Sequence, residues 1–269
     1  MRWMNKINNI HINKPMTAYQ GGKLRLGKRI SNVMNLIEDD IGTRHLPYME
    51  PFCGMCGVLR HISMSNPGRK LIATDLNHDV ITMWKSLQDG WIPQDTCSRE
   101  DFEELKNQIH PSAEKGFIGS ISCYGNVFMS FYRLHLQPSN RDYIGEAKKS
   151  LYRVFEDVKC ADFSIGSYET SQFDGKVIYC DPPYKGNGFK TPLFKDFDHE
   201  EFWDRMRSWS LVSLVFISER VAPSDFICIW SHDFKASINK QSTTSICEKL
   251  FIHEIWYNTL STIVKEKLI

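Results

Sequence analysis

The most constraining feature of this sequence is a repeated order of apolar runs and helical patterns between residues 48 and 90. Residues 48–52 (YMEPF) predict the end of a strand, and a glycine turn and an apolar helical segment follow it. Residues 70–75 (KLIATD) predict a second strand that ends in an acid, and residues 76–90 a helix that stops at Gly90. This order is typical of the first half of a nucleotide-type α/β fold, with a mostly parallel sheet and helices on both faces.

The same alternation returns later in the chain, after an irregular stretch rich in glycine, serine, asparagine and aromatic residues. Outside that stretch the patterns predict helices over 26–42, with Gly42 as the stop, 146–158 and 200–210, and strands over 161–166, 176–180, 214–218, 226–230 and 248–258. We therefore expect an α/β core formed by residues 1–90 and 151–269. Residues 91–150 would be a smaller inserted recognition region.

The composition is that of an ordinary globular protein, with 42% hydrophobic and 24% charged residues in 269. The sequence contains no run of eighteen apolar residues, so no transmembrane helix is predicted. The first residues have no apolar stretch of the signal-peptide type. The eight cysteines are irregularly spaced. These observations predict a cytoplasmic protein without a membrane partner.

One pair of cysteines, Cys53 and Cys56, has the CxxC spacing of redox and zinc sites. No second CxxC or CxH pair lies near it in the sequence to complete a zinc site, so no metal is expected. A thiol redox pair is the alternative, and the neighbouring glycines favour another use of this segment.

Charge is unevenly distributed although the net charge is only +1. The first 37 residues contain no acid, against seven Lys or Arg, among them Arg25, Lys28 and Arg29. A solvated surface usually mixes both signs, so this segment favours contact with phosphate groups.

A polar motif follows the predicted strand over 176–180. Pro182 and Pro183 lack backbone donors and end the strand, so Asp181 and Tyr184 lie at its carboxyl end. In an open α/β sheet, ligands bind at that edge.

A glycine turn and a second acid follow the strands of residues 48–75. Gly54 and Gly57 permit close approach of the backbone to a ligand, and Asp75 stands where an acid accepts both hydroxyls of a ribose in dinucleotide sites. A role of Asp75 as the cap of the next helix is the alternative. Because the glycine spacing is not GxGxxG, the site is predicted to bind an adenosine without a pyrophosphate.

Four motifs in this chain order resemble those of the Dam-type, D12 class DNA adenine N6-methyltransferases, which use S-adenosylmethionine. They are Tyr19-Gln-Gly-Gly-Lys23, Glu50-Pro-Phe-Cys-Gly-Met-Cys-Gly57, Thr74-Asp75-Leu-Asn77 and Asp181-Pro-Pro-Tyr184. The resemblance implies a Rossmann-like methyltransferase sheet and a site-specific enzyme that methylates N6 of adenine in double-stranded DNA. It also implies a role in restriction–modification or in regulation, between which the sequence does not choose.

The resemblance assigns roles residue by residue. It implies that S-adenosylmethionine is bound by Tyr19, Lys23, Phe52, Gly54, Gly57, Asp75, Asp162 and Phe163, with Asp181 close to it, and that Asp181, Pro182, Pro183 and Tyr184 are catalytic. Lys28, Arg29, Arg133 and Arg141 are candidate DNA contacts by their charge, with solvated side chains as the alternative for the last two.

The amino group of adenine is a poor nucleophile, because its lone pair is delocalised into the ring. The catalytic motif that the resemblance implies suits such an amine. Hydrogen bonds from N6 to the Asp181 carboxylate and the Pro182 carbonyl would localise that lone pair for in-line methyl transfer. Tyr184 offers a ring for stacking of the base, which must be flipped out of the duplex to arrive there.

The sequence departs from the best-known Dam enzymes before the catalytic motif, where "SCYGNVFMSFYRL" replaces a block that helps to recognise GATC. The target sequence therefore stays open. Alternatives are an RNA adenine or cytosine N4 methyltransferase of the same geometry and a catalytically idle DNA-binding relative.

Overall fold

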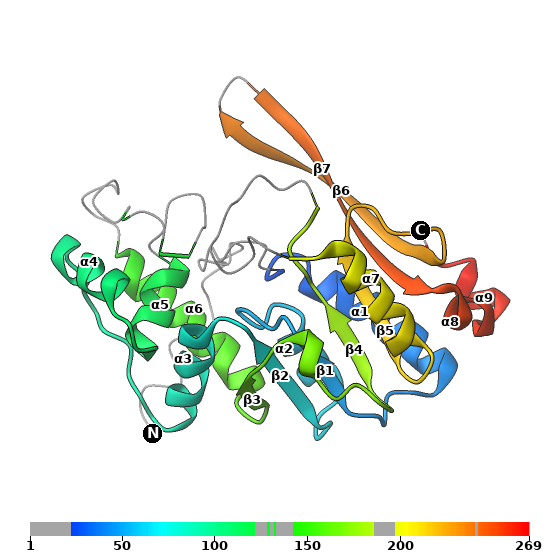
Figure 1. Ribbon diagram of the computed structural model, residues 1–269, viewed down its shortest axis with the longest axis horizontal. Coiled ribbons are helices and arrows are strands. Elements are labelled where there is room, and N and C mark those ends of the chain that lie inside the picture. Colours follow the sequence, from blue (N-terminus) through cyan, green and yellow to red (C-terminus); the bar gives the residue numbers. More distant parts are fainter. Residues whose placement is uncertain are drawn as a thin grey trace, which may run out of the picture.

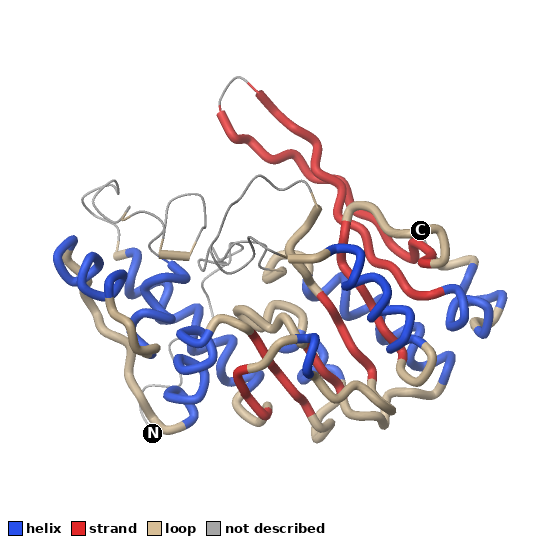
Figure 2. The backbone as a smooth tube through the Cα atoms, in the orientation of Figure 1, coloured by secondary structure: helices blue, strands red, loops and turns tan. Residues whose placement is uncertain are grey.

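The computed structural model describes residues 23–121, 128–129, 132, 142–185, 197–239 and 242–268, without the side chains of 234–239 and 242–246. Within these residues one sheet has the strand order β3-β2-β1-β4-β5-β7-β6 (Figures 1 and 2). The strands are β1 (Tyr48–Glu50), β2 (Leu71–Asp75), β3 (Asp162–Ile165), β4 (Val177–Cys180), β5 (Leu214–Glu219), β6 (Phe226–Asn239) and β7 (Ser242–His253). Neighbouring strands from β3 to β5 are parallel, whereas β7 is antiparallel to both of its neighbours.

Helices connect most of these strands. They are α1 (Gly27–Ile41), α2 (Leu59–Ser65), α3 (His78–Gln88), α4 (Arg99–Asn107), α5 (Ala113–Ile121), α6 (Tyr143–Val158), α7 (His199–Ser210), α8 (Glu254–Thr259) and α9 (Thr262–Lys265). The predicted stop of the first helix is confirmed, since Gly42 follows α1 with a left-handed φ of 80°. Only glycine adopts this φ at low cost.

Buried side chains cover both faces of the sheet, because successive residues of a strand point to opposite sides. On one face, Tyr48 and Val177 belong to the buried cluster that contains the apolar side chains of α1, α2 and α6. On the other face, Met49 and Ile178 pack with apolar side chains of α7, among them Trp209. The predicted α/β class with helices on both faces is therefore confirmed.

The inserted region is more regular than the sequence suggested. The helices α4 and α5 lie within residues 91–150, and α6 runs through residue 150, where the insertion was predicted to end. The short helix α4 begins at a capping box, in which Ser98 and Asp101 exchange side-chain to backbone hydrogen bonds. The prediction that this region is a separate recognition domain stays a prediction.

The C-terminal elements differ from the prediction of one strand over 248–258. The strand β7 ends at His253, and residues 254–259 form α8, because the His253 side chain accepts the amide of Ile255 and caps the helix. The strands β6 and β7 also continue as a long hairpin that projects beyond the other strands (Figures 1 and 2).

Candidate active site

Three neighbouring strands of the sheet present the predicted motifs at one edge. The strand β2 ends in Asp75, β1 is followed by the glycine turn of residues 51–57, and β4 is followed by Asp181. These strands are parallel and lie in the order β2-β1-β4, so the glycine turn lies between the two acids. The edge formed by the carboxyl ends is the predicted ligand edge of such a sheet.

The Asp75 carboxylate organises the glycine turn. Its Oδ2 accepts the amide of Gly54 at 2.8 Å and its Oδ1 the amide of Asn77 at 2.8 Å. Gly54 has a φ of 43°, which suits glycine, and its carbonyl accepts the indole N–H of Trp84 at 2.9 Å. Burial raises the pKa of Asp75, and the two amides oppose that rise.

The alternative role of Asp75 as the cap of α3 is not what the structure shows. The side-chain oxygen of Asn77 accepts the amides of Asp79 and Val80 and is therefore the cap. Asp75 keeps both oxygens at the ligand edge, where each has a second lone pair besides the one that accepts an amide.

Gly57 lets the glycine turn touch the chain that leads into α1. A Cβ added to Gly57 would lie 2.7 Å from the amide nitrogen of Leu24 and 2.8 Å from the carbonyl carbon of Lys23. Any side chain would push these backbones apart. The glycine predicted from the motif is therefore needed for the position of Lys23.

Lys23 links the first motif to the last one, because its ammonium Nζ donates to Asp181 Oδ1 at 2.7 Å. The same Nζ lies 3.7 Å from Oε2 of Glu248 on β7, and the hydroxyl of Tyr184 donates to that Oε2 at 2.6 Å. The Lys23 ammonium also lies 4.8 Å from the centre of the Tyr184 ring. We name Lys23, Asp181, Tyr184 and Glu248 the catalytic cluster.

Burial dominates the electrostatics of this cluster. The side chains of Lys23, Asp181 and Glu248 are 5%, 16% and 11% exposed. The pKa of Asp181 is raised to about 6: burial is the largest cause, the Lys23 ammonium opposes the rise, and the Glu248 carboxylate adds to it. An aspartate with this pKa is largely ionised at pH 7 and accepts N–H donors.

Two other acids near the edge were given no role in the sequence analysis. Burial raises the pKa of Glu50, at the end of β1, to about 8, and its carboxylate accepts the hydroxyl of Tyr48 at 2.8 Å. Glu219, at the end of β5, accepts the amides of Lys185 and Arg220 at 3.2 and 2.6 Å and so fixes the chain after the catalytic motif.

The sequence around Glu248 has the pattern of a strand end, but only the pairing of the strands shows at which edge of the sheet this residue lies. The residue stands before the apolar run Leu250-Phe251-Ile252, as Asp181 follows one. Because β7 is antiparallel to β5, with Glu219 opposite Lys249, the start of this run reaches the edge at which β5 ends. Without that register, Glu248 looks like an ordinary solvated acid.

The other predicted cofactor residues fall in two groups. The half-buried ring of Phe52 follows β1 at the edge and stacks on Tyr168 at 5.4 Å. On β3, Phe163 is buried and stacks on Trp84 at 5.6 Å. The structure does not bring Asp162 to the edge, because this exposed residue begins β3, opposite Ile72 near the start of β2.

The candidate DNA contacts on α1 lie on its first turn, beside the glycine turn. The side chains of Lys28 and Arg29 are exposed, and the Arg29 guanidinium contacts the His232 ring of β6 at 2.8 Å. Tyr19, Arg133 and Arg141, also predicted as site residues, lie outside the described residues.

The cysteines of the CxxC motif are buried beneath the glycine turn. The exposed fractions of Cys53 and Cys56 are 4% and 0%, and burial raises the pKa of both thiols. In the described residues no group of three or more His, Cys, Asp or Glu side chains is placed to hold a metal ion. No helix among these residues has the length and apolar content to cross a membrane.

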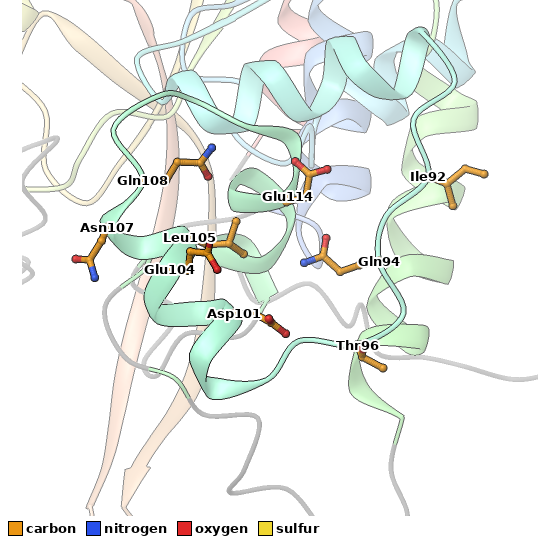
Figure 3. A pocket seen from close by; sticks show the side chains of 9 residues that line it. All are labelled: Ile92, Gln94, Thr96, Asp101, Glu104, Leu105, Asn107, Gln108 and Glu114. Carbon is orange, nitrogen blue, oxygen red and sulfur yellow. The ribbon is translucent and has the colours of Figure 1, made fainter.

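A hollow of about 830 Å³ lies away from this edge, between α4, α5 and the chain before α4 (Figure 3). It is lined by Ile92, Gln94, Thr96, Asp101, Glu104, Leu105, Asn107, Gln108 and Glu114. Asp101 belongs to the capping box of α4, and Glu114 accepts the indole N–H of Trp91 at 2.9 Å. The hollow contains no member of the catalytic cluster, and its acidic lining does not suit a nucleic acid.

Comparison with known proteins supports the predicted class, a methyltransferase. Residues 19–119 match the family of D12 class N6 adenine-specific DNA methyltransferases. The family predicted from the four motifs is therefore confirmed, and with it the enzyme class, adenine-specific DNA methyltransferase.

Two named relatives are similar to this chain over more residues than the family match covers. The type II methyltransferase M.MjaIII of Methanocaldococcus jannaschii is 25% identical over 229 residues, which are 71% of this chain and 75% of that protein. The DNA adenine methylase of Escherichia coli K12 is 28% identical over 173 residues, which are 54% of this chain and 60% of that protein.

Solved structures resemble the chain only distantly. A proposed RNA methyltransferase of Pyrococcus horikoshii has a TM-score of 0.38 at 10% identity and covers 82% of this chain, with 81% of its own chain covered. TrmN of Thermus thermophilus has a TM-score of 0.35 at 10% identity, with 82% and 47% covered. The fold assignment therefore rests on the strand order of this chain.

Proposed function

We propose that this protein transfers a methyl group from S-adenosylmethionine to N6 of adenine in double-stranded DNA, with the base flipped out of the duplex. The observation that supports it most is the order of the motifs along one sheet edge: Asp75, the glycine turn and Asp181, on the neighbouring strands β2, β1 and β4. The donor and acceptor sites would then lie side by side.

The donor side fits an adenosine. Asp75 is 6% exposed, and its oxygens, each of which accepts one amide, have further lone pairs for the two hydroxyls of a ribose. Gly54, whose amide donates to Asp75, adds no side chain beside it. S-adenosylmethionine would supply a methyl group on a positively charged sulfur, which makes that carbon electrophilic.

The acceptor side fits an amine. Asp181 supplies an oxygen acceptor, and Pro182, whose φ is fixed by its ring, supplies a carbonyl in a fixed direction. Two such acceptors hold the two N–H groups of an exocyclic amino group and direct its lone pair away from the ring, which is transition-state stabilisation by preorganised dipoles. The acceptor amine therefore needs an ionised Asp181.

Duplex DNA as the acceptor has support in the charge near this edge. Arg25, Lys28 and Arg29 are exposed on or just before the first turn of α1, whose N-terminal residue contacts the glycine turn. Phosphate contacts of this kind give affinity without reading sequence.

The test is incubation of the purified protein with donor labelled in its methyl group and with unmethylated duplex DNA, followed by identification of the methylated nucleoside by mass spectrometry. We expect N6-methyladenine from wild-type protein and a loss of at least about a hundredfold in rate for Asp181→Asn. Donor affinity should stay within a few fold, and Asp174→Asn, an exposed change before the same strand, is the matched control.

Other outcomes separate the alternatives. N4-methylcytosine, or methylation of RNA in preference to DNA, would replace the proposed acceptor by another one. Binding of DNA without any methyl transfer would identify an idle relative. Full methylation by a well-folded Asp181→Asn variant would show that the carboxylate does not hold the amine.

A further inference from the structure

The β6–β7 hairpin extends beyond the sheet on the side of the catalytic cluster. The last residue of β5, Glu219, pairs with Lys249 of β7, and Lys249 pairs with Ser231 of β6. Past that point the described parts of β6 and β7 pair with each other alone, as far as Asn239 and Ser242. Because β5 ends at the carboxyl edge of the sheet, the hairpin projects from the edge that holds the catalytic cluster (Figures 1 and 2).

The projecting part is long for a structure of only two strands. At about 3.3 Å per residue, β6 runs about 25 Å from Ser231 to Asn239. A two-stranded hairpin is marginally stable at best in water, so this length adds little to the stability of the sheet. The register shifts between Cys228 and Trp230, where the hairpin leaves the sheet, and such irregularities bend a strand and are frequent next to active sites. These features are typical of an element that serves a partner.

The base of the hairpin is attached to the first turn of α1. The Arg29 guanidinium contacts both ring nitrogens of His232 on β6, at 3.1 and 2.8 Å. The Trp230 ring stacks on His232, with the ring centres 5.9 Å apart and an angle of 20° between the planes. The hairpin is therefore continuous with the exposed cations Arg25, Lys28 and Arg29.

The hairpin also carries a member of the catalytic cluster. His232 is the cross-strand partner of Glu248, whose carboxylate accepts the Tyr184 hydroxyl at 2.6 Å. A base held at Asp181 would therefore lie beside the base of the hairpin. The duplex from which that base is flipped would lie outside the edge, on the side to which the hairpin projects.

The composition of the projecting part suits a polyanion. Residues 234–246 contain two lysines and no acid, and seven of the other residues have a hydroxyl or amide side chain. Lys, Ser, Thr, Asn and Gln are side chains that contact the phosphates of DNA. The major groove of B-DNA, about 12 Å wide, admits a two-stranded β-ribbon, whereas the minor groove is only about 6 Å wide.

On the basis of the proposed function, we propose that the β6–β7 hairpin beyond Asp233 and Cys247 docks in the major groove of the duplex next to the flipped adenine. The hairpin supplies affinity and orients the duplex, and the catalytic cluster receives the base. The DNA surface then has two parts that are distant in sequence, the first turn of α1 and the hairpin, joined by the contact between Arg29 and His232.

The first test shortens the hairpin. Asp233 and Cys247 are cross-strand partners, so an Asn-Gly turn in place of residues 234–246 closes the hairpin below its projecting part. We expect the dissociation constant for duplex DNA, measured by fluorescence anisotropy, to rise at least tenfold. Donor affinity by calorimetry should stay within twofold of wild type, because the donor side of the edge is untouched. Unchanged affinity for DNA would overturn the proposal, and so would an equal loss of donor affinity, which indicates a structural role.

A charge reversal tests the same contact without shortening the chain. Lys235→Glu and Lys240→Glu together should weaken binding of the duplex at least tenfold in 0.1 M salt, because two negative charges would then face the phosphates. The matched control is Lys70→Glu with Lys159→Glu, the same change of charge on exposed residues before β2 and β3, at the amino edge of the sheet. Screening over about 10 Å should keep this control within threefold of wild type. Equal losses in both pairs would show an effect of net charge alone and overturn the proposal.

Sedimentation of the wild-type and shortened proteins tests a second copy of this chain as the partner instead. We expect the same oligomeric state for both proteins. A dimer that dissociates on shortening, with unchanged affinity for DNA, would overturn the proposal.

Failure of the proposed function is a distinct result. If the wild-type protein binds DNA through the hairpin but does not methylate adenine, the proposed function is wrong and the contact stands. If the wild-type protein methylates adenine and the shortened variant binds the duplex as tightly, only the role of the hairpin is wrong.

Discussion

Replacing Gly57 by alanine should separate the first motif from the rest of the site. The added Cβ would lie 2.7 Å from the amide nitrogen of Leu24 and 2.8 Å from the carbonyl carbon of Lys23. Both atoms belong to the backbone, so no change of rotamer relieves the contact. The chain before α1 must move away from the glycine turn.

The size of the effect follows from these distances. Overpacking in a well-packed interior costs typically about 1–3 kcal/mol, and contacts with backbone atoms belong at the upper end of that range. For a protein of this size, about 3 kcal/mol corresponds to a melting temperature lower by roughly 6–12 °C. Since Lys23 moves with its backbone, its ion pair with Asp181 should lengthen and methyl transfer should fall as well.

Thermal unfolding monitored by circular dichroism and the single-turnover rate measure the two effects. Gly166→Ala is a suitable control for stability, because a Cβ there would meet only the Thr74 side chain, at 3.7 Å. It should melt close to wild type. A Gly57→Ala variant that melts within about 1 °C of wild type and transfers methyl at the wild-type rate would refute the close approach that this reasoning requires.

Two further predictions concern charge. The pKa of Glu50 is raised to about 8, so between its ordinary value and about pH 8 the folded state keeps a proton that the unfolded state releases, and stability falls as pH rises through that window. Glu50→Gln should remove this dependence. In urea unfolding, its free energy of unfolding should exceed that of wild type at pH 8 by on the order of a few kcal/mol, but not at pH 4. An equal slope of the free energy of unfolding against pH in both proteins would contradict the buried proton. Neutralising Arg25, Lys28 and Arg29 together should reduce the slope of DNA affinity against salt concentration by about one unit for each phosphate that the variant no longer neutralises, and an unchanged slope would show that they are only a solvated face.

The parts of the fold that depend on local pattern could be predicted from the sequence. The strands β2 and β4 and the stop of α1 at Gly42 follow from apolar runs and glycine, and the structure has them within a few residues of the predicted positions. The predicted strand over 248–258 was wrong after His253, because a cap competes with a strand there and the apolar pattern does not reveal it.

The parts of the site that depend on pairing between distant strands could not be predicted in this way. Lys23 was expected at the cofactor, and the structure brings its ammonium to Asp181. Glu248 was missed because its place at the edge follows from the antiparallel register of β7 on β5, which no local pattern contains. The distal part of the β6–β7 hairpin is largely polar, so its length was also hidden.

The position of β7 in the sheet has a consequence for synthesis. Lys23 leaves the ribosome before Asp181, and the strand that carries Glu248 and fills the place between β5 and β6 emerges after both. Until then β5 is an open edge, which is prone to pair with other chains, and the ammonium and the Tyr184 hydroxyl lack one of their acceptors. Long-range pairing of this kind slows folding, so we expect this edge of the sheet to be completed only after β7 has left the ribosome.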